Sequence, residues 1–240
     1  MSDVQETSAG AETPAAQVDP TFDLLDRPVA LEGADDIILS APAPDTPTVD
    51  GRRVEDPRLI EALSVPQEFT RADVLDRVAK LGGVLRVLGG DGASKLLVSS
   101  DVPEPARTFA VLAGVRIGLV VELPVAAADG ASSVTRPVVD AETLTIRAHR
   151  DGEETAEESP HAFKTAVRTV RSHFEGVAVE GGGQARDLDR LARDSRIVPA
   201  PSRRRDGSRR ALVIDGEDVL LADVAQHLQG LLRTNGADGL

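Results

Sequence analysis

Two groups of basic residues in the C-terminal half of the chain could bind an anion. The first lies in residues 159–174, which we expect to form a helix because apolar residues recur there at helical spacing. Beside the apolar stripe, one arc of this helix carries four cationic or titratable side chains, His161, Lys164, Arg168 and Arg171. Such a row suits the recognition of phosphates or of an acidic protein surface.

The second group surrounds a turn predicted at Asp206-Gly207. It consists of five arginines, Arg203, Arg204, Arg205, Arg209 and Arg210. An arginine-rich hairpin can reach a phosphate backbone, as the wing of a winged helix does. Because the chain has no Trp or Tyr and only five Phe, we expect contacts with phosphates rather than with stacked bases. The alternatives are an acidic protein partner, the chain's own acidic tail, and a solvated loop without a specific role.

The remaining polar motifs do not form a catalytic or cofactor-binding set. The glycine-rich run at 89–95 leads into a predicted strand, whereas a phosphate-binding loop leads into a helix. The chain has no Cys, and its four His lack the spacing of metal ligands. We therefore predict no catalytic residue, metal or cofactor. The sequence favours a protein that is not an enzyme, although residues distant in the sequence can still meet in a fold.

The elements that would position these residues indicate a mixed α/β (α+β) fold. A capping box at Thr70 and Asp73 begins a helix over 71–81, and Gly82-Gly83 is expected to end it. Short strands are predicted at 84–88 and 96–98. A helix capped by Asp101 then runs to Gly114, and a strand follows at 115–123. Strand, helix and strand form a βαβ unit, which implies a parallel pair buried on both faces.

Further elements are predicted towards the C-terminus. Residues 134–149 are typical of a β-hairpin, and 184–195 of a helix. Asp215-Gly216 indicates a hairpin between 211–214 and 218–221, followed by a helix at 222–233. We expect four regions: a disordered acidic Pro/Ala-rich tail at 1–56, an α/β domain at 57–150, an acidic linker at 151–158, and a basic helical and hairpin region at 159–240.

The N-terminal region has the composition of a disordered segment. Residues 1–50 hold six Pro and a single base, Arg27. Two apolar patches interrupt it, formed by Phe22, Leu24 and Leu25 and by Ile37, Ile38 and Leu39. Each patch could order on a protein partner or on the chain's own body.

Part of the chain resembles the second half of Mrr-type restriction-endonuclease domains. The runs that carry the resemblance are FTRADVL (69–75), LLVSSDVPEPAR (96–107) and GVRI (114–117). The strand predicted at 84–88 departs from the family pattern. That family holds a metal ion with an Asp and a Glu/Gln-x-Lys motif upstream. Here Asp35 and Asp36 precede an apolar run, but the first Lys is Lys80. The resemblance thus implies an inactive fold that is retained for binding.

Charge and composition complete the functional hypothesis. The net charge is −13, yet residues 161–210 carry 12 bases and 6 acids. The absence of a signal peptide or of a long apolar run predicts a soluble, cytoplasmic protein without a membrane partner, and 24 Arg against 3 Lys suggest a high-GC bacterial or phage genome. We expect a non-catalytic binding or regulatory protein that contacts nucleic-acid phosphates, with the acidic tail modulating. The alternative is an assembly or adaptor protein, including a phage-type structural protein, that docks a partner through its tail. The oligomeric state is left open.

Overall fold

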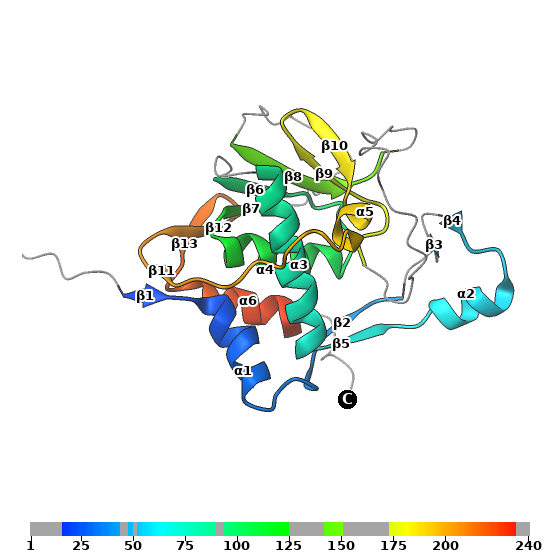
Figure 1. The fold of residues 1–240 in the computed structure, drawn as a ribbon, viewed down its shortest axis with the longest axis horizontal. Helices are drawn as coiled ribbons and strands as arrows, with labels where there is room; N and C mark the ends of the chain where they lie inside the picture. Colours follow the sequence, from blue (N-terminus) through cyan, green and yellow to red (C-terminus); the bar gives the residue numbers. More distant parts are fainter. Residues whose placement is uncertain are drawn as a thin grey trace, which may run out of the picture.

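The structure is a computed structural model that describes residues 16–43, 48–49, 52–89, 94–124, 142–150 and 173–233. A seven-stranded sheet organises these residues, in the strand order β10-β9-β8-β6-β7-β12-β13. Helices α3, α4 and α6 lie on the same side of the sheet (Figure 1). The predicted mixed α/β class is therefore confirmed.

The centre of the sheet is parallel and its edges are antiparallel. The parallel strands are β8 (Thr143–Ala148), β6 (Lys95–Val98), β7 (Val120–Leu123) and β12 (Arg210–Ile214). The antiparallel edge strands are β9 (Val177–Gly181), β10 (Gln184–Asp187) and β13 (Glu217–Leu220). Strands from the predicted domains 57–150 and 159–240 thus share one sheet.

The predicted βαβ unit is β6, α4 (Ala106–Ile117) and β7, and its strands are parallel as expected. Helix α4 packs so closely on the sheet that a Cβ at Gly114 would lie 2.5 Å from Val121 and 2.8 Å from Leu96. Gly114 therefore lies within the helix, and Gly118, with a φ of 88°, ends it. The predicted helix end at Gly114 and the strand start at 115 were wrong by about one turn.

Two further details of this unit differ from expectation. Asp101 does not cap α4, whose N-cap residue is Pro105. Asp101 Oδ1 instead accepts a hydrogen bond of 3.2 Å from Ala148 N, and this bond links the ends of β6 and β8. The expectation that both faces of the strand pair are buried was also wrong. On the face opposite α4, the side chains of Lys95 and Glu122 are 41% and 37% exposed and lie 3.9 Å apart.

Helix α3 (Arg71–Gly89) is longer than the sequence predicted. The capping box is confirmed, since Asp73 N donates to Thr70 Oγ1 at 3.1 Å and Thr70 N donates to Asp73 Oδ2 at 3.2 Å. The helix continues through Gly82-Gly83, and the predicted strand at 84–88 is its last part. Val84 and Leu85 are buried in the core, so packing favours the helix over the glycine signal.

The C-terminal elements are partly as predicted. The β12–β13 hairpin is confirmed, with positive φ angles of 54° and 83° at Asp215 and Gly216, and α6 is the expected helix, Val224–Arg233. The predicted helix at 184–195 is instead β10 followed by the short α5, Leu188–Arg193, because Gly182 and Gly183 form a turn with positive φ. The predicted first hairpin arm at 134–141 and the linker at 151–158 lie outside the described residues. So does the predicted helix at 159–174 apart from its last two residues, His173 and Phe174, which are not helical, and His173 has a φ of 65°.

The N-terminal region differs most from expectation. Residues 16–43, here called the N-terminal arm, contain β1 (Gln17–Val18), the π-helical turn η1 (Phe22–Asp26), α1 (Arg27–Ala30) and β2 (Ile37–Ala41). Strand β2 pairs with β5 (Gln67–Thr70) in a separate two-stranded sheet, and not with β6. The predicted disorder over 1–56 therefore does not hold for the arm, because its apolar side chains enter the core. Residues 1–15 lie outside the described part.

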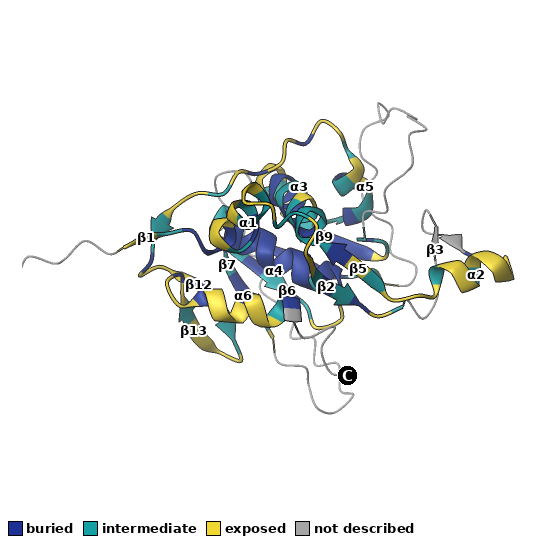
Figure 2. Ribbon diagram, turned by 90° about the horizontal axis from the view of Figure 1, so that it is seen from below, coloured by how far each residue is buried: buried dark blue, intermediate teal, exposed yellow. Residues whose placement is uncertain are grey.

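The elements between the arm and α3 are short. Strands β3 (Thr48–Val49) and β4 (Arg52–Arg53) form a small antiparallel pair, and α2 (Pro57–Leu63) follows with no buried residue. Figure 2 shows α2 as an exposed projection, whereas the central helices α3 and α4 are buried over much of their length.

Candidate anion-binding surface

The predicted arginine loop is reached through a long extended segment, residues 194–204, here called the strap. It leaves α5, crosses α3 and leads into β11 (Arg205–Asp206), as Figure 1 shows. Helix α3 binds its backbone, since Ala200 N donates to Ala79 O at 2.7 Å and Lys80 Nζ donates to Ile197 O at 2.8 Å and to Asp194 O. The strap is thus fixed by hydrogen bonds although it has no regular structure.

Two glycines of α3 let the strap lie directly on the helix. A Cβ at Gly83 would lie 2.2 Å from Val198 O, and one at Gly82 would lie 3.0 Å from Ala200 Cβ. Pro199 and Pro201 in the strap have no N–H group that could be left unsatisfied on the helix surface. The close approach explains why Gly82-Gly83 occurs inside a helix and does not end it.

Arg116 of α4 joins the strap to the N-terminal arm. Its side chain is 4% exposed; Nε donates to Ala200 O at 2.8 Å, and Nη1 and Nη2 form a bidentate pair with Asp26 at 2.7 and 2.8 Å. Nothing in the sequence identified Arg116, Lys80 or Gly83 as positioning residues. An apolar helical pattern on both sides of Gly82-Gly83 was the one available signal of a close contact.

Two of the five predicted arginines serve the fold itself. Arg205 Nη2 donates to Arg116 O at 3.0 Å, and its guanidinium covers Gly118, where a Cβ would lie 2.5 Å from Nε. Burial lowers the pKa of Arg205, and the positive charges of Arg209 and Arg203 act in the same direction, against Asp19. Arg210 is paired with Asp218 at 3.1 Å across the β12–β13 hairpin.

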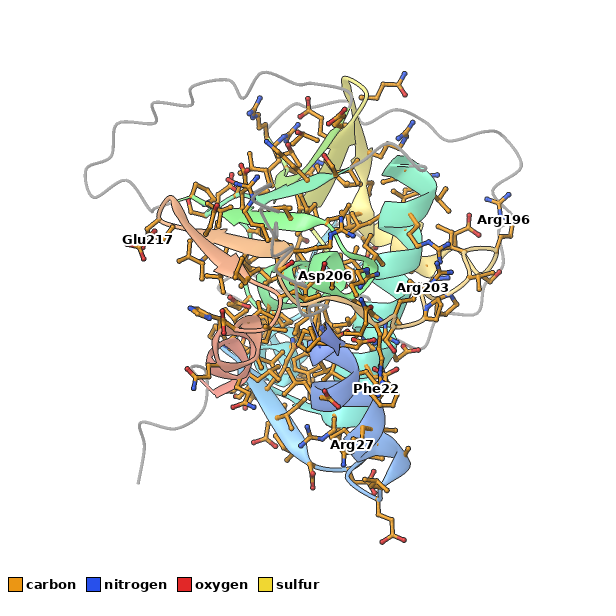
Figure 3. All side chains as sticks on the ribbon, turned by 90° about the vertical axis from the view of Figure 1, so that its left-hand side faces the viewer. Phe22, Arg27, Arg196, Arg203, Asp206 and Glu217 are labelled. Atoms are coloured by element: carbon orange, nitrogen blue, oxygen red, sulfur yellow. The ribbon has the colours of Figure 1, made fainter. Side chains whose placement is uncertain are left out.

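The other three arginines, Arg203, Arg204 and Arg209, are exposed and form no ion pair within the described residues. We call them the arginine surface. Arg203 and Arg209 both lie close enough to Arg205 to affect its pKa, so they belong to one neighbourhood. Figure 3 shows Arg203 on the strap, before Asp206 at the turn.

The turn that carries Arg209, directly after β11, is held on several sides. Gly207 N donates to Ala16 O at 2.9 Å, Leu221 N donates to Arg209 O at 2.7 Å, and Ala222 N donates to Gly207 O at 3.0 Å. Asp206 is the acid within the turn. Its Oδ1 accepts hydrogen bonds from Ser208 Oγ at 2.7 Å and Ser208 N at 2.9 Å, and these bonds lower the pKa of Asp206. The carboxylate therefore caps the turn without a direct ion pair to Arg203, Arg204 or Arg209, and the positive charge of Arg209 also helps to lower its pKa.

The other predicted site residues have three outcomes. The helical group of His161, Lys164, Arg168 and Arg171 lies outside the described residues. Leu25 and Leu39 are fully buried, and Leu24 and Ile38 pack partly buried against the core, so both apolar patches order on the chain's own body. Phe22 and Ile37 remain 39% and 59% exposed.

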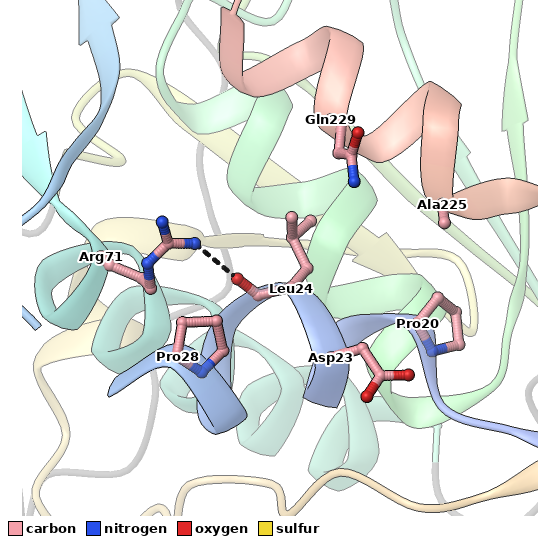
Figure 4. A pocket seen from close by; sticks show the side chains of 7 residues that line it. All are labelled: Pro20, Asp23, Leu24, Pro28, Arg71, Ala225 and Gln229. Carbon is pink, nitrogen blue, oxygen red and sulfur yellow. Dashed lines mark hydrogen bonds between the residues drawn. The ribbon is translucent and has the colours of Figure 1, made fainter. Parts of the chain in front are cut away.

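A pocket of about 250 Å³ lies between the arm, α3 and α6 (Figure 4). Its lining is Pro20, Asp23, Leu24, Pro28, Arg71, Ala225 and Gln229. The guanidinium of Arg71 is already bound, with Nη1 donating to Leu24 O at 2.8 Å, Nε to Gly33 O at 3.2 Å and Nη2 to Asp36 Oδ2 at 3.3 Å. The pocket therefore offers no uncommitted charged donor, and Arg71 serves to attach the arm.

An acidic cluster lies where α5 meets the strap. Arg193 Nη2 is 2.9 Å from Asp189 Oδ2 and 3.5 Å from Glu175 Oε1. Burial, followed by the charge of Glu175, raises the pKa of Asp189 to about 6. Within the described ranges, no three or more His, Asp or Glu side chains are grouped so that they could hold a metal ion. None of the described helices is long and apolar enough to cross a bilayer.

Comparisons with known proteins assign no family to this chain. No protein-family model and no curated protein matches it. Among solved structures, it is similar to an acyl-CoA synthetase of Brucella canis, with 17% identity and a TM-score of 0.49 over 88% of this chain and 35% of that one. The chain thus spans about a third of that protein's length. At this level the similarity carries no argument about function, and the resemblance to Mrr-type domains stays a prediction.

Proposed function

We propose that this chain is a non-catalytic binding protein whose arginine surface contacts the backbone phosphates of a nucleic acid. The observation that supports this proposal is the contrast among the five arginines of 203–210. Two are committed to the fold, whereas Arg203 and Arg204 at the end of the strap and Arg209 at the turn are exposed and form no ion pair within the described residues. Guanidinium groups on a backbone that is already ordered lose less conformational entropy on binding phosphate than the same groups on an unordered chain.

The distribution of aromatic rings supports contact with the backbone rather than with bases. Phe69, Phe109 and Phe174 are buried and pack edge to face in the core, with ring centroids 5.5 and 6.0 Å apart. Stacking platforms for single strands need exposed rings. Among the described residues, Phe22 is the one exposed Phe, and it lies in the arm. We therefore propose binding with little sequence preference.

The test is fluorescence anisotropy with short labelled duplex and single-stranded DNA over a series of salt concentrations. Three phosphate contacts on a duplex should give a slope of log K against log salt of about −2.7. Replacing Arg203, Arg204 and Arg209 by Gln should remove most of this slope and weaken binding to all sequences alike.

The matched control replaces three other exposed arginines that form no ion pair in the described part of the chain: Arg58, Arg86 and Arg190. This variant has the same net charge as the test variant, so a general loss of attraction would affect both. Equal affinities of the two variants would contradict the proposal, and so would the absence of binding by the native chain at the lowest salt.

A further inference from the structure

The chain enters the described fold beside the arginine surface. The carbonyl of Ala16 accepts the hydrogen bond from Gly207 N, and β1 pairs antiparallel with β11, with Val18 opposite Arg205 and Gln17 opposite Asp206. Figure 1 shows β1 next to β11. Ala16, the residue that follows the segment 1–15 in the chain, therefore lies at the turn between Arg204 and Arg209.

Residues 1–15 carry a net charge opposite to that of the arginine surface. Residues 1–15 contain Asp3, Glu6 and Glu12 and no Lys or Arg. Two acids further along the arm, Asp19 and Asp26, already have partners. Asp19 is buried and accepts hydrogen bonds from Thr21 Oγ1 at 2.9 Å and Phe22 N at 3.0 Å, and Asp26 binds Arg116.

The distances along the chain allow contact. Glu12 is four residues before Ala16, a span of at most about 14 Å for an extended chain, and Asp3 is farther out on the same tether. Arg209 is two residues from Gly207, and Arg204 is three. Each tethered acid can therefore reach the arginine surface without any displacement of the arm.

We propose that residues 1–15 occupy the arginine surface as an intramolecular competitor of the polyanion. This inference rests on the proposed function and assigns its regulation to a named segment. A short tether gives an effective concentration in the millimolar range, so an internal contact with a dissociation constant of about a quarter of that concentration reduces the apparent affinity for an external ligand by about fivefold. The arm itself plays no part in this competition, because it is folded into the body.

The first test uses the full chain with the substitutions Asp3→Asn, Glu6→Gln and Glu12→Gln, and measures the Kd for a labelled DNA duplex by anisotropy. We expect binding about fivefold tighter than for the native chain at low salt, and a smaller difference at high salt, where screening weakens the internal contact as well. The control neutralises three exposed acids elsewhere, Glu32, Glu55 and Glu61, and changes net charge by the same amount. Equal Kd values for the two variants would overturn the inference.

The second test needs no nucleic acid and separates the inference from the function on which it rests. Amide chemical shifts of Asp3, Glu6 and Glu12 are compared between the native chain, the variant lacking Arg203, Arg204 and Arg209, and the variant lacking Arg58, Arg86 and Arg190. Shifts that change only in the first variant support the contact. Unchanged shifts in a chain that binds DNA overturn the competition alone. Changed shifts in a chain that never binds DNA or RNA overturn the proposed function and, with it, the competition.

Discussion

The N-terminal arm and the strap both cross the body outside the seven-stranded sheet, but they are held by different chemistry. The arm inserts large apolar side chains, and Leu25 and Leu39 are fully buried. The strap buries only Ile197 and Ala200 and is fixed mainly through its carbonyl groups, which accept hydrogen bonds from Lys80 and Arg116. Order in the arm therefore depends mainly on buried apolar area, to which Arg71 and Arg116 add hydrogen bonds, whereas order in the strap depends on donors supplied by the helices beneath it.

The largest expected effect tests the apolar side of this comparison. Leu25→Ala removes a fully buried side chain from η1 and should lower the free energy of unfolding by about 3 kcal/mol. Leu31→Ala is the control, because Leu31 lies in the same arm but is 68% exposed. It should change stability by less than about 0.5 kcal/mol in urea titrations. Equal losses in both variants would show that the arm is not anchored by burial.

The next effect tests how closely the strap lies on α3. Gly83→Ala places a methyl group 2.2 Å from Val198 O, so the strap must move and stability should fall by about 2 kcal/mol. Faster hydrogen exchange at Ala200 N, which binds Ala79 O, should accompany the loss.

The matched control for this substitution is Gly230→Ala in α6, where a Cβ would meet nothing within 4 Å. It should raise stability by about 0.5–1 kcal/mol, since Ala favours helix over Gly. A gain at both positions would contradict the close approach of strap and helix.

A smaller effect tests the donors. Lys80→Met retains most of the aliphatic side chain but removes the hydrogen bonds to Asp194 O and Ile197 O, and should cost about 1 kcal/mol. The same substitution at Lys95 removes an exposed ion pair of 3.9 Å and should cost less than about 0.5 kcal/mol. If Lys95→Met proved as costly as Lys80→Met, hydrogen bonding to the strap would not explain its order.

The smallest effect is a pH dependence of stability in α5, the helix that precedes the strap. The pKa of Asp189 is about 6 in the folded chain, above its ordinary value of 3.8, because of burial and Glu175. The folded state then binds more protons than the unfolded state between these two values. This contribution to stability is fully present below pH 3.8 and is lost as pH rises through 6.

To measure this contribution, the free energy of unfolding of the native chain and of the Asp189→Asn variant is determined by urea titration at several pH values. The stability of the native chain relative to the variant should fall by about 1 kcal/mol between about pH 4 and pH 7, a value reduced for the partial solvent exposure of the cluster. Asp215→Asn, at an exposed hairpin turn, is the control. A flat difference for Asp189→Asn would refute the raised pKa.

Local signals in the sequence predicted the elements that depend on neighbouring residues. The capping box at Thr70, the βαβ unit around α4, the Asp215-Gly216 hairpin and α6 are all of this kind. The arm and the strap could not be predicted, because their partners are distant in the chain. Asp26 meets Arg116 across 90 residues, and Ala200 meets Arg116 across 84.

In the candidate site, too, the local pattern was predictable and the long-range contacts were not. The sequence identified the five arginines around Asp206-Gly207, but it could not show which of them bond within the fold and which stay exposed. This difference depends on Arg116 O, which accepts a hydrogen bond from Arg205, and on Asp218, which forms an ion pair with Arg210 across the hairpin. Composition likewise predicted disorder for the arm, because a count of prolines and acids does not show that Leu25 and Leu39 pack in the core of the folded chain.

Arg116 also determines how the molecule opens. Its guanidinium binds the arm at Asp26 and the strap at Ala200, and its own carbonyl accepts the hydrogen bond from Arg205 in β11. Detaching any one of these segments leaves a buried charge or carbonyl without its partner and thereby weakens the hold on the other two. Arm, strap and arginine turn should accordingly separate from the body as one cooperative unit, whose amides exchange with solvent in a single sub-global event while the central sheet stays closed.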